Sequence, residues 1–232
     1  MFYVGLTTRY VAFELQQMRD LLEVLSTSLL DFEHKLENTY TIEDLENMDD
    51  NAQDEYEHYI DIFQSVMGDF PRRLYCSFLV SWYSFVEEAL SQLCVDLNIE
   101  IPIRYQDQER FGSGIQRAKK FLTETGQVEI INDHWQELNY IRKIRNQIVH
   151  EGGKFQQSIE KPLDNAQVVP FTNEETTYYI RIEKSLYDYL ERHSLDHFYL
   201  TLLINPPLEY CYYLVDFGEK FFSKVLDDLK LI

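Results

Sequence analysis

The most hydrophobic helix candidate of the sequence is Arg72 to Asn98, RRLYCSFLVSWYSFVEEALSQLCVDLN. Its apolar residues recur at steps of three and four, the spacing of one face of an α-helix. They are Leu74, Phe78, Trp82, Phe85, Ala89, Leu93 and Leu97, with Leu79, Val86 and Leu90 in a second row beside them. An apolar arc this wide predicts a helix buried on more than one side, at the centre of a helical bundle.

Similar periodicity predicts helices before and after this stretch. They are expected at Val11 to Glu37, Ala52 to Met67, Ser113 to Thr125 and Asn132 to His150. A last helix is expected to begin at the capping residue Asn205, which Pro206 and Pro207 follow, and to end at about Asp228. We expect residues 1–70 to be an N-terminal helical extension and residues 71–232 to be the bundle, the two forming one compact unit.

The pattern changes between the last two helices. Gln167 to Phe171 and Tyr178 to Glu183 are rich in Val, Ile, Tyr and Thr, and they flank the turn formers Asn173-Glu174-Glu175. They predict a β-hairpin. Asp196 to Ile204 fits either a strand or a buried helix. The predicted fold class is therefore mainly α, a helical bundle with a small β-hairpin insertion before the last helix.

Composition limits the classes of function. Of 232 residues, 45% are apolar, enough for a full core, and 40 Asp and Glu outweigh 21 Lys and Arg to give a net charge of −19. An overall field of that sign repels nucleic acid, so any RNA-binding role needs a locally basic site. The acidic stretch Glu43 to Glu57 reads as a solvated connector, with docking of a basic partner as the alternative.

The chain also gives expectations about compartment. Its longest nearly unbroken apolar stretch, Cys76 to Val86, is too short to span a bilayer, and Met1 to Tyr10 has no basic region followed by an apolar one. The three cysteines show no C-x-x-C spacing. We expect a cytoplasmic protein with reduced thiols and no membrane partner.

Most catalytic signatures are absent from the sequence. It has no phosphate-binding P-loop, no G-x-G-x-x-G, no H-E-x-x-H, no G-x-S-x-G and no zinc-type Cys/His spacing. We therefore expect no cofactor and no metal site, and a metal-dependent hydrolase built on the excess carboxylates has no ligand spacing to support it.

One segment, Tyr140 to Gly153 (YIRKIRNQIVHEGG), does carry chemistry. On a helical wheel Arg145 falls in the middle of an apolar arc that includes Ile141 and Ile148. Arginine cannot avoid burial of its charge by losing a proton. It must therefore meet a carboxylate, a backbone carbonyl, a subunit interface or an anionic ligand.

Arg142, Asn146 and His150 follow one another at steps of four along a ridge beside that arc. Asn146 lies one turn before His150 and can fix the orientation of its ring. Helix C-terminal carbonyls favour the imidazolium and Arg145 opposes it, so the ring can change charge near neutral pH. A general acid or base needs this property.

The pattern Arg145-Asn146-x-x-x-His150 at the end of a helix resembles the HEPN family. Phe111 to Leu122 (FGSGIQRAKKFL) and Trp135 to Leu138 (WQEL) also look like stand-alone bacterial HEPN proteins. The resemblance covers roughly Leu74 to Gly153 and, more weakly, the last helix. It implies a helical bundle and, as in many members, a metal-independent endoribonuclease whose two motifs face each other across a homodimer.

The same resemblance assigns roles to residues. Arg145 would contact the scissile phosphate, and His150 would assist proton transfer while the ribose 2′-OH attacks, leaving a 2′,3′-cyclic phosphate. Asn146 would orient the histidine. A toxin-antitoxin or antiviral defence setting would follow, with an antitoxin or regulatory protein as a possible partner.

Charge distribution indicates where RNA could bind. Arg104 to Lys154 contains nine Lys and Arg against seven Asp and Glu, so this segment carries none of the acidic excess. The residues that could guide RNA are Arg142, Lys143, Lys119, Lys120 and Lys154. Single-stranded RNA or loop regions suit such a small basic area better than a long duplex.

Two plainer interpretations stay open. Arg145 can be a structural partner of Glu87 or Glu88 on the preceding long helix, with His150 a capping residue. Some HEPN proteins are also interaction modules without nuclease activity, and the acidic surface here would then bind a protein partner.

Overall fold

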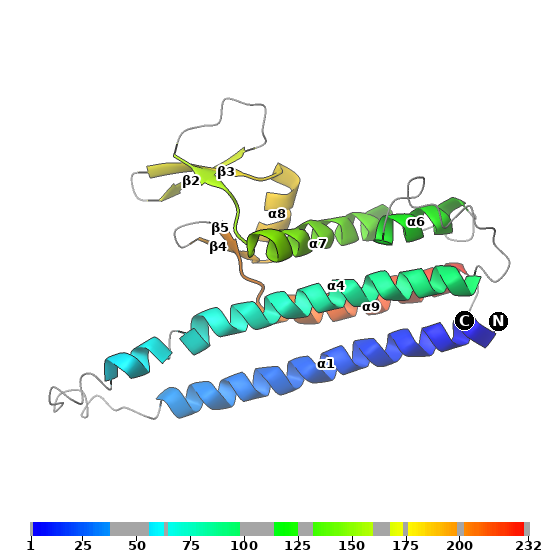
Figure 1. Ribbon diagram of the computed structural model, residues 1–232, viewed down its shortest axis with the longest axis horizontal. Helices are drawn as coiled ribbons and strands as arrows, with labels where there is room; N and C mark the ends of the chain where they lie inside the picture. The colour runs from blue at the N-terminus through cyan, green and yellow to red at the C-terminus, as the bar shows by residue number, and fades with distance from the viewer. Residues whose placement is uncertain are drawn as a thin grey trace.

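The computed structural model describes residues 2–37, 56–62, 65–97, 114–124, 132–159, 168–173, 176–198 and 202–229. The protein is mainly helical, with small antiparallel strand groups before the last helix (Figure 1), which confirms the predicted fold class. Most of the acidic stretch Glu43 to Glu57 lies outside the described residues, as do residues 111–113 of the FGSG segment.

Three long helices, α1 (Phe2–Glu37), α4 (Phe70–Leu97) and α9 (Leu208–Asp228), run side by side and pack against one another (Figure 1). They approach closely at Gly218, where an added Cβ would lie 3.0 Å from Leu15 Cδ2 and 3.4 Å from Trp82 Nε1. Leu15 and Trp82 are buried, so α1 belongs to the same hydrophobic core as the helices that follow residue 70.

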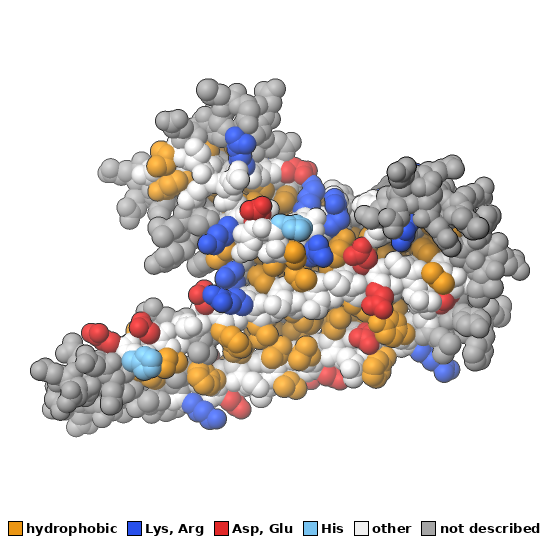
Figure 2. All heavy atoms as spheres, viewed as in Figure 1, with side chains coloured by type: hydrophobic (Ala, Val, Ile, Leu, Met, Phe, Trp, Pro, Cys, Tyr) orange, Lys and Arg blue, Asp and Glu red, His pale blue; other side chains and the backbone are white. Residues whose placement is uncertain are grey.

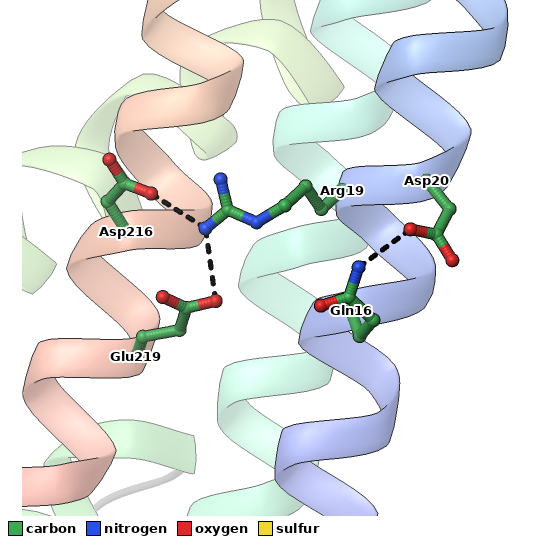
Figure 3. Close-up of polar contacts among 5 residues, drawn as sticks. All are labelled: Gln16, Arg19, Asp20, Asp216 and Glu219. Atoms are coloured by element: carbon green, nitrogen blue, oxygen red, sulfur yellow. Dashed lines mark hydrogen bonds and ion pairs between the residues drawn. The ribbon is translucent and has the colours of Figure 1, made fainter.

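An ion-pair cluster also joins α1 to α9 (Figure 3). The Arg19 guanidinium lies 2.8 Å from an Asp216 carboxylate oxygen and 3.0 Å from one of Glu219. Both carboxylates are about half exposed, so the pairs add little to stability and mainly fix the register of the two helices.

The other face of α4 packs against α6 (Gly114–Glu124) and α7 (Asn132–Glu151), which follow each other along it (Figure 1). The buried side chains recur at the predicted three- and four-residue steps. They are Ile115, Ala118, Phe121 and Leu122 on α6, and Trp135, Leu138, Ile141 and Ile144 on α7. Helix α4 is thus covered on more than one side, as its wide apolar arc predicts.

The strands lie together beyond the C-terminal end of α7 (Figure 1). β1 (Gln157–Ser158), β2 (Val168–Asn173) and β3 (Thr176–Arg181) form an antiparallel sheet in the order β1-β3-β2. The β2–β3 pair confirms the predicted hairpin. After α8 (Lys184–Arg192), β4 (Asp196–Phe198) pairs with β5 (Leu202–Ile204), which resolves the ambiguous segment as strands.

Three helix boundaries differ from the predictions. Helix α1 begins at Phe2, well before the predicted start at Val11. A π-helical turn, η1 (Ser65–Asp69), runs directly into α4, so Pro71 does not separate two helices. Pro71 is the second residue of α4, and its missing N–H removes one possible backbone hydrogen bond where η1 joins α4. The last helix, α9, begins at Leu208 and not at the predicted Asn205, and Pro207 is its N-cap residue. The Asn205 backbone N–H donates to the Leu195 carbonyl (2.8 Å), which ties the end of β5 to the residue before β4.

Candidate functional site

The C-terminal half of α7 is held by a glycine stop. Gly152 and Gly153 have φ of 61° and 80°, and the Gly153 N–H donates to the Gln147 carbonyl at 3.0 Å, which ties the glycines back to the last turn of the helix. The Gln147 amide also donates to the Lys154 carbonyl. These contacts place His150, which is exposed, in the last turn of the helix beside the strands.

Arg145 is half-buried and faces α4, as its place in the apolar arc predicts. Its guanidinium carbon lies 6.0 Å from the centre of the Tyr83 ring, and its Nη1 donates to Asn146 Oδ1 at 3.0 Å. Its Nε is buried and has no hydrogen-bond partner among the residues that the structure describes. The side chain is therefore held in place with part of its donor capacity unused.

The two carboxylates suggested as structural partners of Arg145 do not pair with it. Within the described part of the chain, Arg145 makes no ion pair with Glu87 or Glu88. The Glu87 carboxylate lies against Gly114, where an added Cβ would be 1.8 Å from Glu87 Oε1, and Glu88 is exposed. The Tyr83 ring takes the place of a carboxylate.

A second guanidinium lies near the same tyrosine. Arg142 Nη2 donates to Asn139 Oδ1 at 2.9 Å, and its Nε, like that of Arg145, is buried without a partner in the described ranges. Burial, and next the charge of Glu87, raise the pKa of Tyr83 to about 12, while both guanidinium groups act to lower it. The phenol stays protonated, and two arginines with unused donors lie around it.

An open groove with a cavity volume of about 390 Å³ lies along another side of the same half-helix. Its α7 wall is made by Lys143, Asn146, Gln147, His150 and Glu151. Asn146 is thus in contact with Arg145 on one side and borders the groove on the other. On the face drawn in Figure 2, Lys and Arg side chains gather over α7 and the elements next to it.

The opposite wall comes from the segment around the sheet. It consists of Phe155, Arg181, Ile182, Glu183 and Leu186. Lys143 on α7 forms an ion pair with Glu183, which joins the two walls. Hydrogen bonds from Lys143 and, next, from Ser185 lower the pKa of Glu183.

Of the residues predicted to guide RNA, Lys143 lines the groove, and Arg142 lies toward Tyr83. Of the residues predicted to be catalytic, Asn146 and His150 line the groove, and Arg145 lies toward Tyr83. Lys119 on α6 lies 5.5 Å above the ring of Trp135 on α7, and Lys120 is exposed on α6. Lys154 is exposed after the glycine stop, and these three lysines do not border the groove.

Several residues of this region were not singled out from the sequence, among them Tyr83, Arg181 and Glu183. Tyr83 carries the ring beneath Arg145, and Arg181 and Glu183 build the far wall of the groove. Tyr83 lies in a long apolar helix where a tyrosine is ordinary core. Arg181 ends β3 and Glu183 follows it, 30 residues or more after the motif, and no spacing links them to the motif.

Three further findings concern metal binding, membrane-spanning helices and known relatives. Within the described ranges, no group of three or more His, Cys, Asp and Glu side chains is arranged to hold a metal ion. No helix there is long and apolar enough to cross a membrane. Comparison with known proteins gives no match to a family model, to a curated protein or to a solved structure.

Proposed function

We propose that the protein is a metal-independent endoribonuclease that works as a homodimer. The observation that carries the proposal is the pair of half-buried guanidiniums, Arg142 and Arg145, whose Nε donors lack partners among the described residues, on the same half-helix as His150. A buried arginine keeps its charge and its fork of donors, which matches the oxygens of a phosphate diester.

The chemistry follows from these groups. Arg145, assisted by Arg142, would bind the non-bridging oxygens of the scissile phosphate and stabilise the charge that grows on them. His150 would take the proton of the ribose 2′-OH as that oxygen forms its bond to phosphorus. The bond from phosphorus to the 5′-oxygen breaks, and the 5′-oxygen gains a proton from water. The products are a 2′,3′-cyclic phosphate and a 5′-hydroxyl.

Val149 supports the homodimer. It is 47% exposed and lies on the same helix surface as Arg142, Arg145 and Asn146. An apolar side chain in the middle of a polar motif suits an isologous contact, in which the same surface of two copies meets. Such a contact would bring two copies of the arginine pair together and exclude water from the phosphate.

RNA cleavage in EDTA tests the proposal. We expect the wild-type protein to cut single-stranded RNA, and we expect Arg145→Ala and His150→Ala each to reduce the rate by at least about a hundredfold. Arg73→Ala and His58→Ala, at exposed positions outside α7, serve as matched controls. Wild-type protein that leaves diverse RNAs intact while it is folded and dimeric contradicts the proposal.

The dimer has its own test. Val149→Asp should convert the dimer to a monomer in sedimentation experiments and reduce cleavage, because a charge at the centre of an isologous contact faces its own copy. Val95→Asp is a matched control, since Val95 is also exposed, at 59%, but lies on α4. Cleavage by monomeric protein at the wild-type rate would contradict the homodimeric site.

A second candidate function, a protein interaction module, is favoured by α1. Apolar side chains at helical spacing form an exposed stripe on this helix, and Figure 2 shows apolar side chains along α1 and between α1 and α4. The stripe consists of Tyr10 (37% exposed), Phe13 (59%), Leu21 (49%) and Val24 (62%). Asp20 and Asp31 are exposed beside it, so its chemistry suits the apolar face of a basic amphipathic helix.

Calorimetry with a cationic amphipathic helical peptide separates this candidate from the nuclease. Binding that weakens with salt and is lost in Val24→Asp supports it, because that substitution places a carboxylate inside the apolar contact. Ala12→Asp, at another exposed position of α1, is the control. Equal binding by both variants excludes the stripe as the docking surface.

A further inference from the structure

The groove beside His150 has the properties of a binding site for a flat, partly polar ligand. Its apolar part is made by Phe155, Ile182 and Leu186, which are only 7%, 5% and 7% exposed. Its volume of about 390 Å³ lies within the range of roughly 300–1,000 Å³ typical of small-molecule sites. The buried apolar wall suits the face of an aromatic ring, and the polar rim suits its edge.

The rim offers a donor and an acceptor on neighbouring residues. Asn146 Oδ1 accepts a hydrogen bond from Arg145, which leaves the Asn146 amide NH₂ as a donor. The Gln147 amide nitrogen donates to the Lys154 carbonyl, which leaves Gln147 Oε1 as an acceptor. Both amides are fixed by these bonds, so the donor and acceptor are pre-oriented for one ligand edge.

The groove is also connected to the proposed phosphate position. Asn146 lies between them, since it binds Arg145 and lines the groove. If a ligand binds Arg145 through its phosphate, the part of the ligand next to that phosphate can therefore extend past Asn146 into the groove. A nucleotide has this combination of a phosphate and a flat ring with donors and acceptors on its edge.

We propose that the groove binds the unpaired base of the nucleotide next to the scissile phosphate, and that Asn146 and Gln147 select it by hydrogen bonds to its edge. This inference rests on the proposed ribonuclease function. It makes the substrate single-stranded, because a base within a duplex cannot present its edge to a protein groove.

The Lys143–Glu183 ion pair places one positive and one negative charge at the groove. In the structure Glu183 holds the Lys143 ammonium and also accepts a hydrogen bond from Ser185 at 2.5 Å. Replacement of Glu183 by glutamine removes a carboxylate from the wall and releases the lysine toward the RNA backbone. The base-reading amides on α7 are unchanged by it, so charge and base recognition can be tested separately.

The experiment measures binding of four 2′-O-methyl oligonucleotides, one for each base, to the full-length protein by fluorescence anisotropy. The methyl group blocks attack by the 2′-oxygen, so binding is observed without cleavage. We expect wild-type protein to prefer one base by about tenfold, the size of effect of a good pair of base-edge hydrogen bonds. Gln147→Leu should bind all four equally, and Gln136→Leu, an exposed position on the same helix, should keep the preference.

Glu183→Gln tests the charge of the groove, and its expected effect is tighter binding of RNA. It should tighten binding of all four oligonucleotides by about threefold to tenfold, since it removes a negative charge and frees a positive one. Glu191→Gln, which makes the same charge change at an exposed position on α8 outside the groove, should have little effect. Circular dichroism confirms that each variant is folded before it is scored.

The outcomes separate this inference from the function on which it rests. Cleavage of RNA without base preference, with Gln147→Leu and Glu183→Gln both like wild type, overturns the groove and leaves the nuclease. Base-dependent binding that Gln147→Leu removes, in a protein that cuts no RNA, keeps the groove as a nucleotide site and overturns the nuclease.

Discussion

Helix α7 carries two polar clusters that differ in how far their hydrogen-bonding groups are satisfied. In its first half, Glu137 accepts hydrogen bonds from the hydroxyls of Tyr189 and Tyr213, the latter at 2.7 Å, and Tyr189 also bonds Tyr210 at 2.9 Å. In its second half, Arg142 and Arg145 keep unpartnered Nε donors within the described structure.

This difference in hydrogen bonding indicates which of the two clusters stabilises the fold. A carboxylate with two phenol donors is satisfied by the protein itself, so its burial contributes to folding. A guanidinium with an unmet donor lowers stability until an anion binds it. The Glu137 cluster therefore serves the structure, and the arginine pair is the better candidate for a ligand site.

Removal of Glu137 should have the largest effect on stability. Glu137→Ala leaves the Tyr189 and Tyr213 hydroxyls without their charged acceptor, and hydrogen bonds to charged groups contribute about 1.5–3 kcal/mol each. We expect a loss of about 3 kcal/mol in urea unfolding. Glu151→Ala, an exposed carboxylate on the same helix, should stay within about 0.5 kcal/mol of wild type.

The arginine pair should behave in the opposite way. Replacement of both Arg142 and Arg145 by Met removes two buried donors that lack partners and retains most of the apolar contact with Tyr83. We expect the free energy of unfolding to be unchanged or to rise by up to about 1 kcal/mol, and RNA cleavage to be lost. A loss of stability as large as that of Glu137→Ala would instead identify the arginines as structural residues.

The two clusters also show how far the sequence could predict the site. The helical period placed Arg145 in the apolar arc, and the glycines fixed the end of the helix, because both depend on local geometry. The contact partner of Arg145 was not predictable from spacing. It depends on how α4 packs against α7, and there Tyr83 faces the guanidinium while Glu87 turns toward Gly114.

The same limit applies to the rest of the molecule. The hairpin and the long helices were predictable, because strong periodicity and turn residues mark them. The groove was not, since its far wall comes from Arg181 and Glu183, which the chain brings back to α7 only after it has formed the sheet. The sequence motif therefore shows half of the candidate site.

Substitution of Tyr83, whose ring lies against Arg145, should have a smaller effect, on the rate of cleavage. Tyr83→Phe keeps the aromatic face under the guanidinium, whereas Tyr83→Leu removes it and with it about 0.5–1 kcal/mol of cation–π attraction. Single-turnover cleavage should therefore fall about twofold to fivefold in Tyr83→Leu and stay near wild type in Tyr83→Phe. Equal losses in both variants would assign the effect to the phenol hydroxyl.

The smallest effect concerns His193, whose ring lies 4.5 Å from the Tyr189 ring and 4.8 Å from that of Tyr213. Burial lowers its pKa from the ordinary value of 6.5, Glu137 opposes the shift, and Arg192 adds to it. The unfolded chain then binds more protons than the folded one as the pH falls below 6.5, so this contribution to stability is complete above that pH and is lost as the pH falls through the folded pKa. Urea unfolding at several pH values gives the free energy of unfolding as a function of pH. Below pH 6.5 this free energy should fall less steeply for His193→Phe than for wild type. His58→Phe, at an exposed position, should keep the wild-type dependence on pH. If His193→Phe also keeps the wild-type dependence on pH, His193 contributes nothing to it, and the carboxylates of the protein must account for the change of stability with pH.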